Sequence, residues 1–128
     1  LGIAALAALA IGALITNVAL KNIIARIRPY EVVEGLKLLI EPQSDFSFPS
    51  GHTCASIGAA LAMYPFLERK WGIPLVILAV LISLSRLYVG VHYPTDVLGG
   101  AVVGAFAAWG AVRVVKHGLV RKAKKAEK

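Results

Sequence analysis

Residues 1–20 read LGIAALAALAIGALITNVAL, a run that contains no charged side chain. In a helix at 1.5 Å per residue, such a run spans about 30 Å, which is the thickness of the hydrocarbon core of a bilayer. Three more apolar segments follow at about residues 50–67, 73–86 and 95–115. We therefore predict an all-α protein, an integral-membrane helical bundle with four transmembrane helices, of which the first continues as a helix toward Arg28.

The composition of the whole chain also favours a membrane protein. Of the 128 residues, 58% are hydrophobic and 16% are charged, and the mean hydropathy is +0.73. Soluble domains carry about 25% charged residues. The net charge of +7 does not indicate nucleic-acid binding, because the basic residues form no stripe with interleaved aromatic side chains. The single cysteine, Cys54, lies in an apolar segment and is expected to be a small buried side chain.

The connections between the apolar segments differ in character. Residues 68–72 and 87–94 are short, and the third apolar segment needs residues up to Val91 to cross a bilayer. Residues 29–49 are longer and contain four acidic residues, so we expect an interfacial loop, with a short helix, over the active face. Residues 116–128 form a basic tail. We see no repeat and no second domain, and we treat residues 1–128 as a single membrane domain.

Small residues recur at four-residue spacing within the apolar segments. The pairs are Gly100 with Gly104, Gly58 with Ala62, and Ala8 with Gly12. Such spacing allows membrane helices to approach closely, although ordinary helices rich in alanine and glycine also contain it.

The distribution of charge predicts the topology. If the segments alternate in direction, nine of the 14 basic residues lie on one side, at residues 69–70 and from Arg113 onward. By the positive-inside rule that side is cytoplasmic. Three clusters of reactive residue types then share the opposite, extracytoplasmic side of the cell membrane. These clusters are Lys21 with Arg28-Pro29, Pro49-Ser50-Gly51-His52, and Ser85-Arg86 with His92 and Asp96.

The residue types in these clusters suit a tetrahedral oxyanion. Lys21, Arg28 and Arg86 would repel one another unless an anion joins them, and the planar fork of arginine matches phosphate. Ser50 can cap the second helix, and Gly51 permits close backbone approach to an anion at the first helical turn.

The two histidines can supply the chemistry. Asp96 lies four residues after His92, in the first turn of a helix that starts near Pro94, so its carboxylate can orient one imidazole nitrogen. The other nitrogen of His92 is then free to attack phosphorus. His52 is placed to protonate the leaving oxygen and later to activate a water molecule. A metal ion is a poor fit, because three nearby cations would repel it.

Each cluster also has a simpler interpretation when taken alone. A lysine or arginine at the end of a membrane helix is often an anchor that reaches the interface, and we interpret Arg26 and Lys37 in this way. A Ser-Gly pair before a helix is often only a cap.

Together, the three clusters resemble the type 2 phosphatidic acid phosphatase superfamily. The signature of that family has three parts: Lys, six residues, Arg-Pro; Pro-Ser-Gly-His; and Ser-Arg, five residues, His, three residues, Asp. All three occur here in order and with the same internal spacing, from Lys21 to Asp96. Membrane members of the family have a six-helix core, so the resemblance implies that this chain lacks the first two helices.

The resemblance implies a role for each matched residue. His92 is similar to the family's nucleophile, Asp96 to its partner and His52 to its general acid and base. The implied phosphate ligands are Lys21, Arg28, Ser50, Gly51 and Arg86. The implied activity is a metal-independent lipid phosphatase without a cofactor, acting through phosphohistidine on undecaprenyl diphosphate, phosphatidylglycerophosphate or phosphatidate.

Two other functions remain open on the sequence. The same pocket could hold vanadate in an enzyme of the vanadium haloperoxidase type. Alternatively, the chain could bind or transport lipid without catalysis. The histidine pair argues against this last interpretation.

Overall fold

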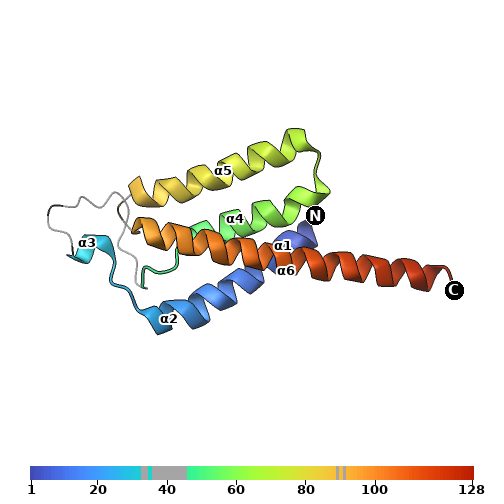
Figure 1. Ribbon diagram of the computed structural model, residues 1–128, viewed down its shortest axis with the longest axis horizontal. Helices are drawn as coiled ribbons and strands as arrows, with labels where there is room; N and C mark the ends of the chain where they lie inside the picture. The colour runs from blue at the N-terminus through green and yellow to red at the C-terminus, as the bar shows by residue number, and fades with distance from the viewer. Residues whose placement is uncertain (33–34, 36–45, 89, 91) are drawn as a thin grey trace.

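The structure is a computed structural model that describes residues 1–32, 35, 46–88, 90 and 92–128. All regular structure within these residues is helical (Figure 1), which confirms the all-α prediction. Lys37 and most of the long loop expected over the active face lie outside the described residues.

The helices form four stretches along the chain. The first comprises α1 (Gly2–Ala13), the π-helix η1 (Leu14–Leu20) and α2 (Lys21–Ile24). A short helix, α3 (Pro29–Val32), follows. The second stretch is α4 (Gly51–Met63) with the 3₁₀ turn η2 (Tyr64–Phe66). The remaining two stretches are single helices, α5 (Arg69–Tyr88) and α6 (Pro94–Ala126).

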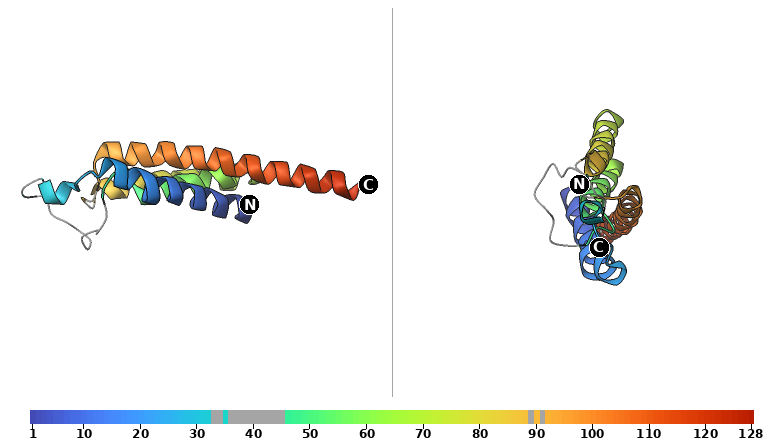
Figure 2. Two further views of the ribbon diagram at one scale, coloured as in Figure 1. Left: turned by 90° about the horizontal axis from the view of Figure 1, so that it is seen from below. Right: turned by 90° about the vertical axis from the view of Figure 1, so that its left-hand side faces the viewer.

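Successive stretches run in opposite directions (Figures 1 and 2). As a result, the ends of α2 and α5 lie at the same end of the bundle as the beginnings of α4 and α6. We call this the site end, and the opposite end, where Arg69 and the C-terminus lie, the far end. The central helix is α4, which contacts α1, α5 and α6, whereas α5 packs mainly on α4.

Small residues allow α4 and α6 to pack with their backbones nearly in contact. A Cβ atom added to Gly104 would lie 2.7 Å from the carbonyl oxygen of Cys54, and one added to Gly100 would lie 2.5 Å from that of Ser50. A Cβ on Gly58 would be 3.3 Å from the Gly104 oxygen. The four-residue spacing therefore marks a true helix contact, and it holds the beginnings of α4 and α6 together.

The outer surface of the bundle is apolar and its interior is made of small residues. Buried positions include Ala4, Ala8, Ala62, Ala108 and Ala111. Large side chains such as Leu6, Leu81 and Phe106 are more than half exposed. In water this arrangement would be costly, but lipid tails solvate large apolar side chains and leave small ones for helix packing. The chain is therefore a multi-pass membrane protein.

The four predicted membrane crossings are not all supported by the lengths of the observed helices. Within the described residues, three stretches are long and apolar enough to cross a bilayer: Gly2–Val32, Arg69–Tyr88 and Pro94–Ala126. The 13-residue α4 is shorter than a bilayer core, at about 20 Å. In contrast, α5 does not need the residues up to Val91, because it begins at Arg69, within the expected turn.

Two helix ends differ from the prediction. The first stretch does not continue toward Arg28 but ends at Ile24, where Ala25 adopts a left-handed conformation with φ of 49°. Conversely, the expected basic tail is helical as far as Ala126. Its lysines and alanines have high helix propensity, and helix formation does not require that they be buried.

Candidate active site

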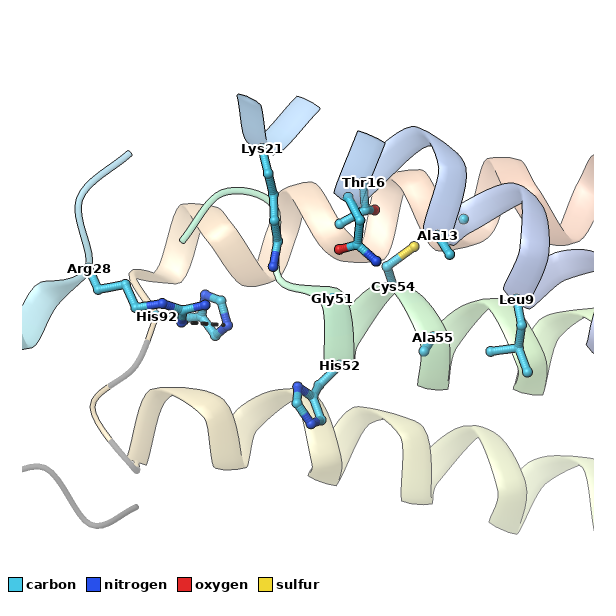
Figure 3. A pocket seen from close by; sticks show the side chains of 12 residues that line it. Leu9, Ala13, Thr16, Lys21, Arg28, Gly51, His52, Cys54, Ala55 and His92 are labelled. Atoms are coloured by element: carbon cyan, nitrogen blue, oxygen red, sulfur yellow. Dashed lines mark hydrogen bonds between the residues drawn. The ribbon is translucent and has the colours of Figure 1, made fainter. Parts of the chain in front are cut away.

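The site end of the bundle contains a pocket of about 420 Å³ between the first helical stretch and α4 (Figure 3). One part of its wall is polar and is formed by Lys21, Arg28, Gly51, His52 and His92. The pocket then continues along apolar side chains of α1 and α4, among them Leu9, Ala13 and Ala55. A cationic chamber therefore opens into an apolar groove between α1 and α4.

His92 and Asp96 form a buried pair at the beginning of α6. The Asp96 carboxylate is fully buried, and its Oδ2 accepts a hydrogen bond from the Tyr93 N–H at 2.8 Å. The same oxygen lies 3.5 Å from His92 Nδ1, at the outer limit of a hydrogen bond. Proline at position 94 starts the helix here, and this places Asp96 in the first turn, as the spacing predicted.

Arg28 approaches the other nitrogen of the same imidazole. Its Nη1 lies 3.5 Å from His92 Nε2, drawn as a dashed line in Figure 3. A guanidinium group can only donate, so this contact favours the tautomer with an unprotonated Nε2. That tautomer carries its proton on Nδ1, facing Asp96. The two neighbours of His92 therefore favour the same tautomer, in which Nε2 is unprotonated.

The N-terminus of α4 forms another wall of the chamber. Ser50 caps the helix, since its Oγ accepts from the Thr53 N–H at 3.4 Å, and its own N–H donates to the Asp96 carbonyl at 2.9 Å. A Cβ on Gly51 would lie 3.8 Å from Lys21 Nζ, so the ammonium group lies close to this helix start. An anion between them would be attracted to both the ammonium group and the first-turn N–H groups.

Arg86 approaches from the end of α5. It lies close enough to His52 and Arg28 to interact electrostatically with both. Its Nε atom is buried, and within the described part of the chain it has no hydrogen-bond partner. Buried donors are rarely left unsatisfied, so this nitrogen could donate to an additional acceptor bound beside it.

Comparison with known proteins agrees with this geometry. The family model described as "PAP2 superfamily" matches residues 1–118. The chain belongs to the PAP2 superfamily. It is 44% identical over 102 residues to an undecaprenyl-diphosphatase, BcrC, of Bacillus subtilis, covering 80% of this chain and 49% of that protein. The chain spans about half the length of the curated relatives it matches.

Two solved structures share the fold. The crystal structure of Aquifex aeolicus LpxE superposes with a TM-score of 0.80 at 28% identity, covering 87% of this chain and 66% of that one. The transmembrane PAP2-type phosphatidylglycerolphosphate phosphatase of Bacillus subtilis superposes with a TM-score of 0.72 at 31% identity, covering 91% of this chain and 59% of that one. The two Bacillus subtilis relatives are both phosphatases, one of undecaprenyl diphosphate and the other of phosphatidylglycerolphosphate.

The residues predicted to form the site do not all occupy the same part of it. Four of the predicted side chains, together with the backbone of Gly51, line the chamber: Lys21, Arg28, His52 and His92. Ser50 and Asp96 lie behind its wall, completely buried. Ser50 therefore has a visible structural role as a helix cap, and its part as a phosphate ligand stays a prediction. Arg86 lies beside the chamber without lining it.

Sequence reasoning missed one residue of this PAP2 site. We interpreted Arg26 as a membrane anchor, but its Nη1 lies 2.8 Å from Asp96 Oδ1. The error came from extending the first helix to Arg28. The helix in fact ends before Ala25, and Arg26 and Arg28 both reach the pair formed by Asp96 and His92. The spacing of Arg26 and Arg28 could have indicated this, had the helix end been recognised.

Proposed function

We propose that this chain is the catalytic part of a membrane phosphatase that hydrolyses a lipid phosphate or diphosphate through a phosphohistidine intermediate. The observation that carries the proposal is the pocket itself. Two imidazoles and two cations, Lys21 and Arg28, line one chamber, and the chamber continues into an apolar groove. A ligand that fits both parts has an anionic head and an apolar chain.

The head group would bind first as an anion. Lys21 and Arg28 line the chamber, and Arg86 lies beside it. The N–H groups at the start of α4 have no carbonyl partner within the helix and add donors of fixed direction. These groups would neutralise the equatorial oxygens of phosphorus as the transition state forms, which is the main requirement of phosphoryl transfer.

Two transfers then complete the reaction. The lone pair of His92 Nε2 attacks phosphorus in line with the departing lipid oxygen, which takes a proton from His52. A P–N bond forms and the P–O bond breaks. Neutral His52 next removes a proton from water, whose oxygen attacks phosphorus and breaks the P–N bond. Inorganic phosphate leaves, and both histidines regain their starting states. Asp96 stabilises the positive charge that develops on His92.

This mechanism needs no metal ion. The positive charge that a metal would supply comes from Lys21, Arg28 and Arg86, and three cations beside the imidazoles would oppose the binding of a fourth. We therefore expect turnover to continue in the presence of a chelator.

The substrate class follows from the groove and from the relatives. The apolar wall of α1 and α4 suits a lipid chain, and the 44% identical relative is an undecaprenyl-diphosphatase. We propose polyprenyl diphosphate as the first candidate, and phosphatidylglycerophosphate or phosphatidate as the next. The cations at the far end, at residues 69–70 and from Arg113 onward, favour a cytoplasmic location there. The site would then lie on the extracytoplasmic side of the plasma membrane.

The test is phosphate release by the full-length protein in detergent from a panel of these lipid phosphates, with and without chelator. We expect turnover of at least one lipid in chelator and ³²P retained on His92 in rapidly quenched reactions. If chelator stops turnover and a divalent ion restores it, the metal-free mechanism is wrong.

Two other outcomes would support the alternative functions. Vanadium-dependent halide oxidation without phosphatase activity would support the haloperoxidase function. Lipid transport that survives His92→Ala would support the non-enzymatic function.

A further inference from the structure

Arg26 joins three segments of the chain immediately behind the chamber. Its guanidinium contacts Asp96 Oδ1 at 2.8 Å and donates to the hydroxyl of Thr95. The guanidinium carbon lies 5.0 Å from the ring centre of Phe48 and 5.7 Å from that of Tyr93. The carbonyl of Arg26 accepts from the Ser47 N–H at 2.9 Å. One residue therefore connects the segment after α2, the segment before α4 and the beginning of α6.

The backbone places Arg26 and Arg28 on opposite sides of the same catalytic pair. After the left-handed Ala25, the chain from Arg26 to Arg28 is not helical, and both side chains reach the beginning of α6. Arg28 reaches His92 Nε2, on the chamber side, and Arg26 reaches the carboxylate of Asp96. Arg26 does not line the chamber, whereas Arg28 does.

We propose that Arg26 is a positioning residue that acts on His92 through Asp96. This inference rests on the proposed function, in which His92 is the nucleophile. Arg26 holds Oδ1, so that Oδ2 remains directed at the Tyr93 N–H and the His92 ring. A fully buried carboxylate is costly without a cation, and Arg26 forms its only ion pair with a permanently charged group among the described residues. The rings of Phe48 and Tyr93 keep the guanidinium plane in place.

The substitution Arg26→Gln separates positioning from phosphate binding. Phosphate inhibition reports binding of the ground-state anion, whereas vanadate forms a trigonal-bipyramidal adduct with an imidazole and reports the position of the nucleophile. We expect kcat and vanadate affinity to fall together by about 10- to 100-fold, with KM and phosphate inhibition changed by less than about two-fold. Arg113→Gln is the matched control, because Arg113 also stacks on an aromatic ring, 4.8 Å from the centre of Trp109, at the far end.

A double-mutant cycle with Asp96→Asn tests whether Arg26 acts through Asp96. If it does, Arg26→Gln changes kcat less than about two-fold once Asp96 is already asparagine. Arg26→Lys keeps the charge without the planar fork, and we expect an intermediate kcat. Losses that multiply in the double variant would overturn the proposal. So would a parallel loss of phosphate inhibition, or a Tm decrease with normal kcat at low temperature.

The same experiment keeps this inference separate from the proposed function. A protein that binds vanadate also unfolds at a higher temperature in its presence, and this increase in Tm is measured without turnover. If the parent protein releases no phosphate but binds vanadate, the proposed function fails, and a loss of vanadate protection in Arg26→Gln still supports positioning. If the parent is active and the cycle is additive, only the role of Arg26 is wrong.

Discussion

The two ends of the bundle carry the same types of cationic side chain in opposite environments. At the far end, Arg121, Lys122, Lys124 and Lys125 are exposed along the last turns of α6. At the site end, Lys21 is 7% exposed and Arg28 only 2%. Exposed cations are solvated by water and salt and need little from the fold. Buried cations require compensating partners, which come from the fold or from a bound anion. Their burial at the site end therefore indicates a functional site.

The difference between the two ends concerns geometry more than charge. Far-end cations follow one another along a single helix, whereas the site-end cations come from α2, the segment after it and α5. Convergence of several segments on one chamber constrains each side chain to a few conformations. We therefore expect substitutions at the site end to change activity, and equivalent substitutions at the far end to leave activity unchanged.

The largest expected difference concerns the histidines. We expect His92→Ala to lower phosphate release by about 10⁴-fold or more, because the substitution removes the nitrogen proposed to attack phosphorus. His117→Ala, at an exposed far-end position of α6, should leave the rate unchanged. Initial rates with a lipid phosphate in detergent test both. Comparable rates for the two variants would remove the functional distinction between the ends.

The next effect concerns arginine geometry. Arg28→Lys retains a positive charge but loses the planar fork, and we expect kcat/KM to fall by about 10²- to 10³-fold. Arg121→Lys makes the same change at the exposed far end and should have no effect. If Arg28→Lys kept more than a tenth of the parental kcat/KM, charge alone would account for anion binding at the site end.

Much of the site end could be predicted because simple spacings determine it. Helices that alternate across a bilayer bring alternate connections to one side, so Lys21, His52 and His92 had to share an end. Proline at position 94 and the spacing of His92 and Asp96 placed the carboxylate in the first helical turn, and Ser50 was recognisable as a cap.

The remaining features depend on contacts that local sequence does not reveal. Alanine is the best helix former, so Ala25 gave no sign of a left-handed turn, and the end of the first helix was wrong for that reason. The role of Arg26 depends on that turn and was missed with it. Similarly, the basic residues after Lys116 were interpreted by charge, although their helix propensity indicated the observed extension of α6.

Glycine-to-alanine substitutions should differ in sign between two positions of α6. At Gly104, which faces α4, the new Cβ would lie 2.7 Å from a backbone oxygen, and we expect unfolding to become easier by about 1–3 kcal/mol. At Gly118, toward the far end, nothing lies within 4 Å, and alanine should stabilise the helix by about 0.5–1 kcal/mol. Thermal unfolding in detergent gives both values. Shifts in the same direction would mean that the close packing of α4 and α6 is not present.

The smallest effect concerns the turn that directs Arg26 and Arg28. Glycine adopts the left-handed conformation without strain but loses more entropy on folding, so Ala25→Gly should change stability by less than about 0.5 kcal/mol. Ala25→Val adds a β-branched side chain to the same strained conformation and should cost about 1–2 kcal/mol. At Ala123, in the exposed far-end helix, valine should cost only about 0.5 kcal/mol, through helix propensity. Thermal unfolding separates the three variants. If valine were tolerated equally well at both positions, the chain would not turn at Ala25, and the positions of both arginines would need another explanation.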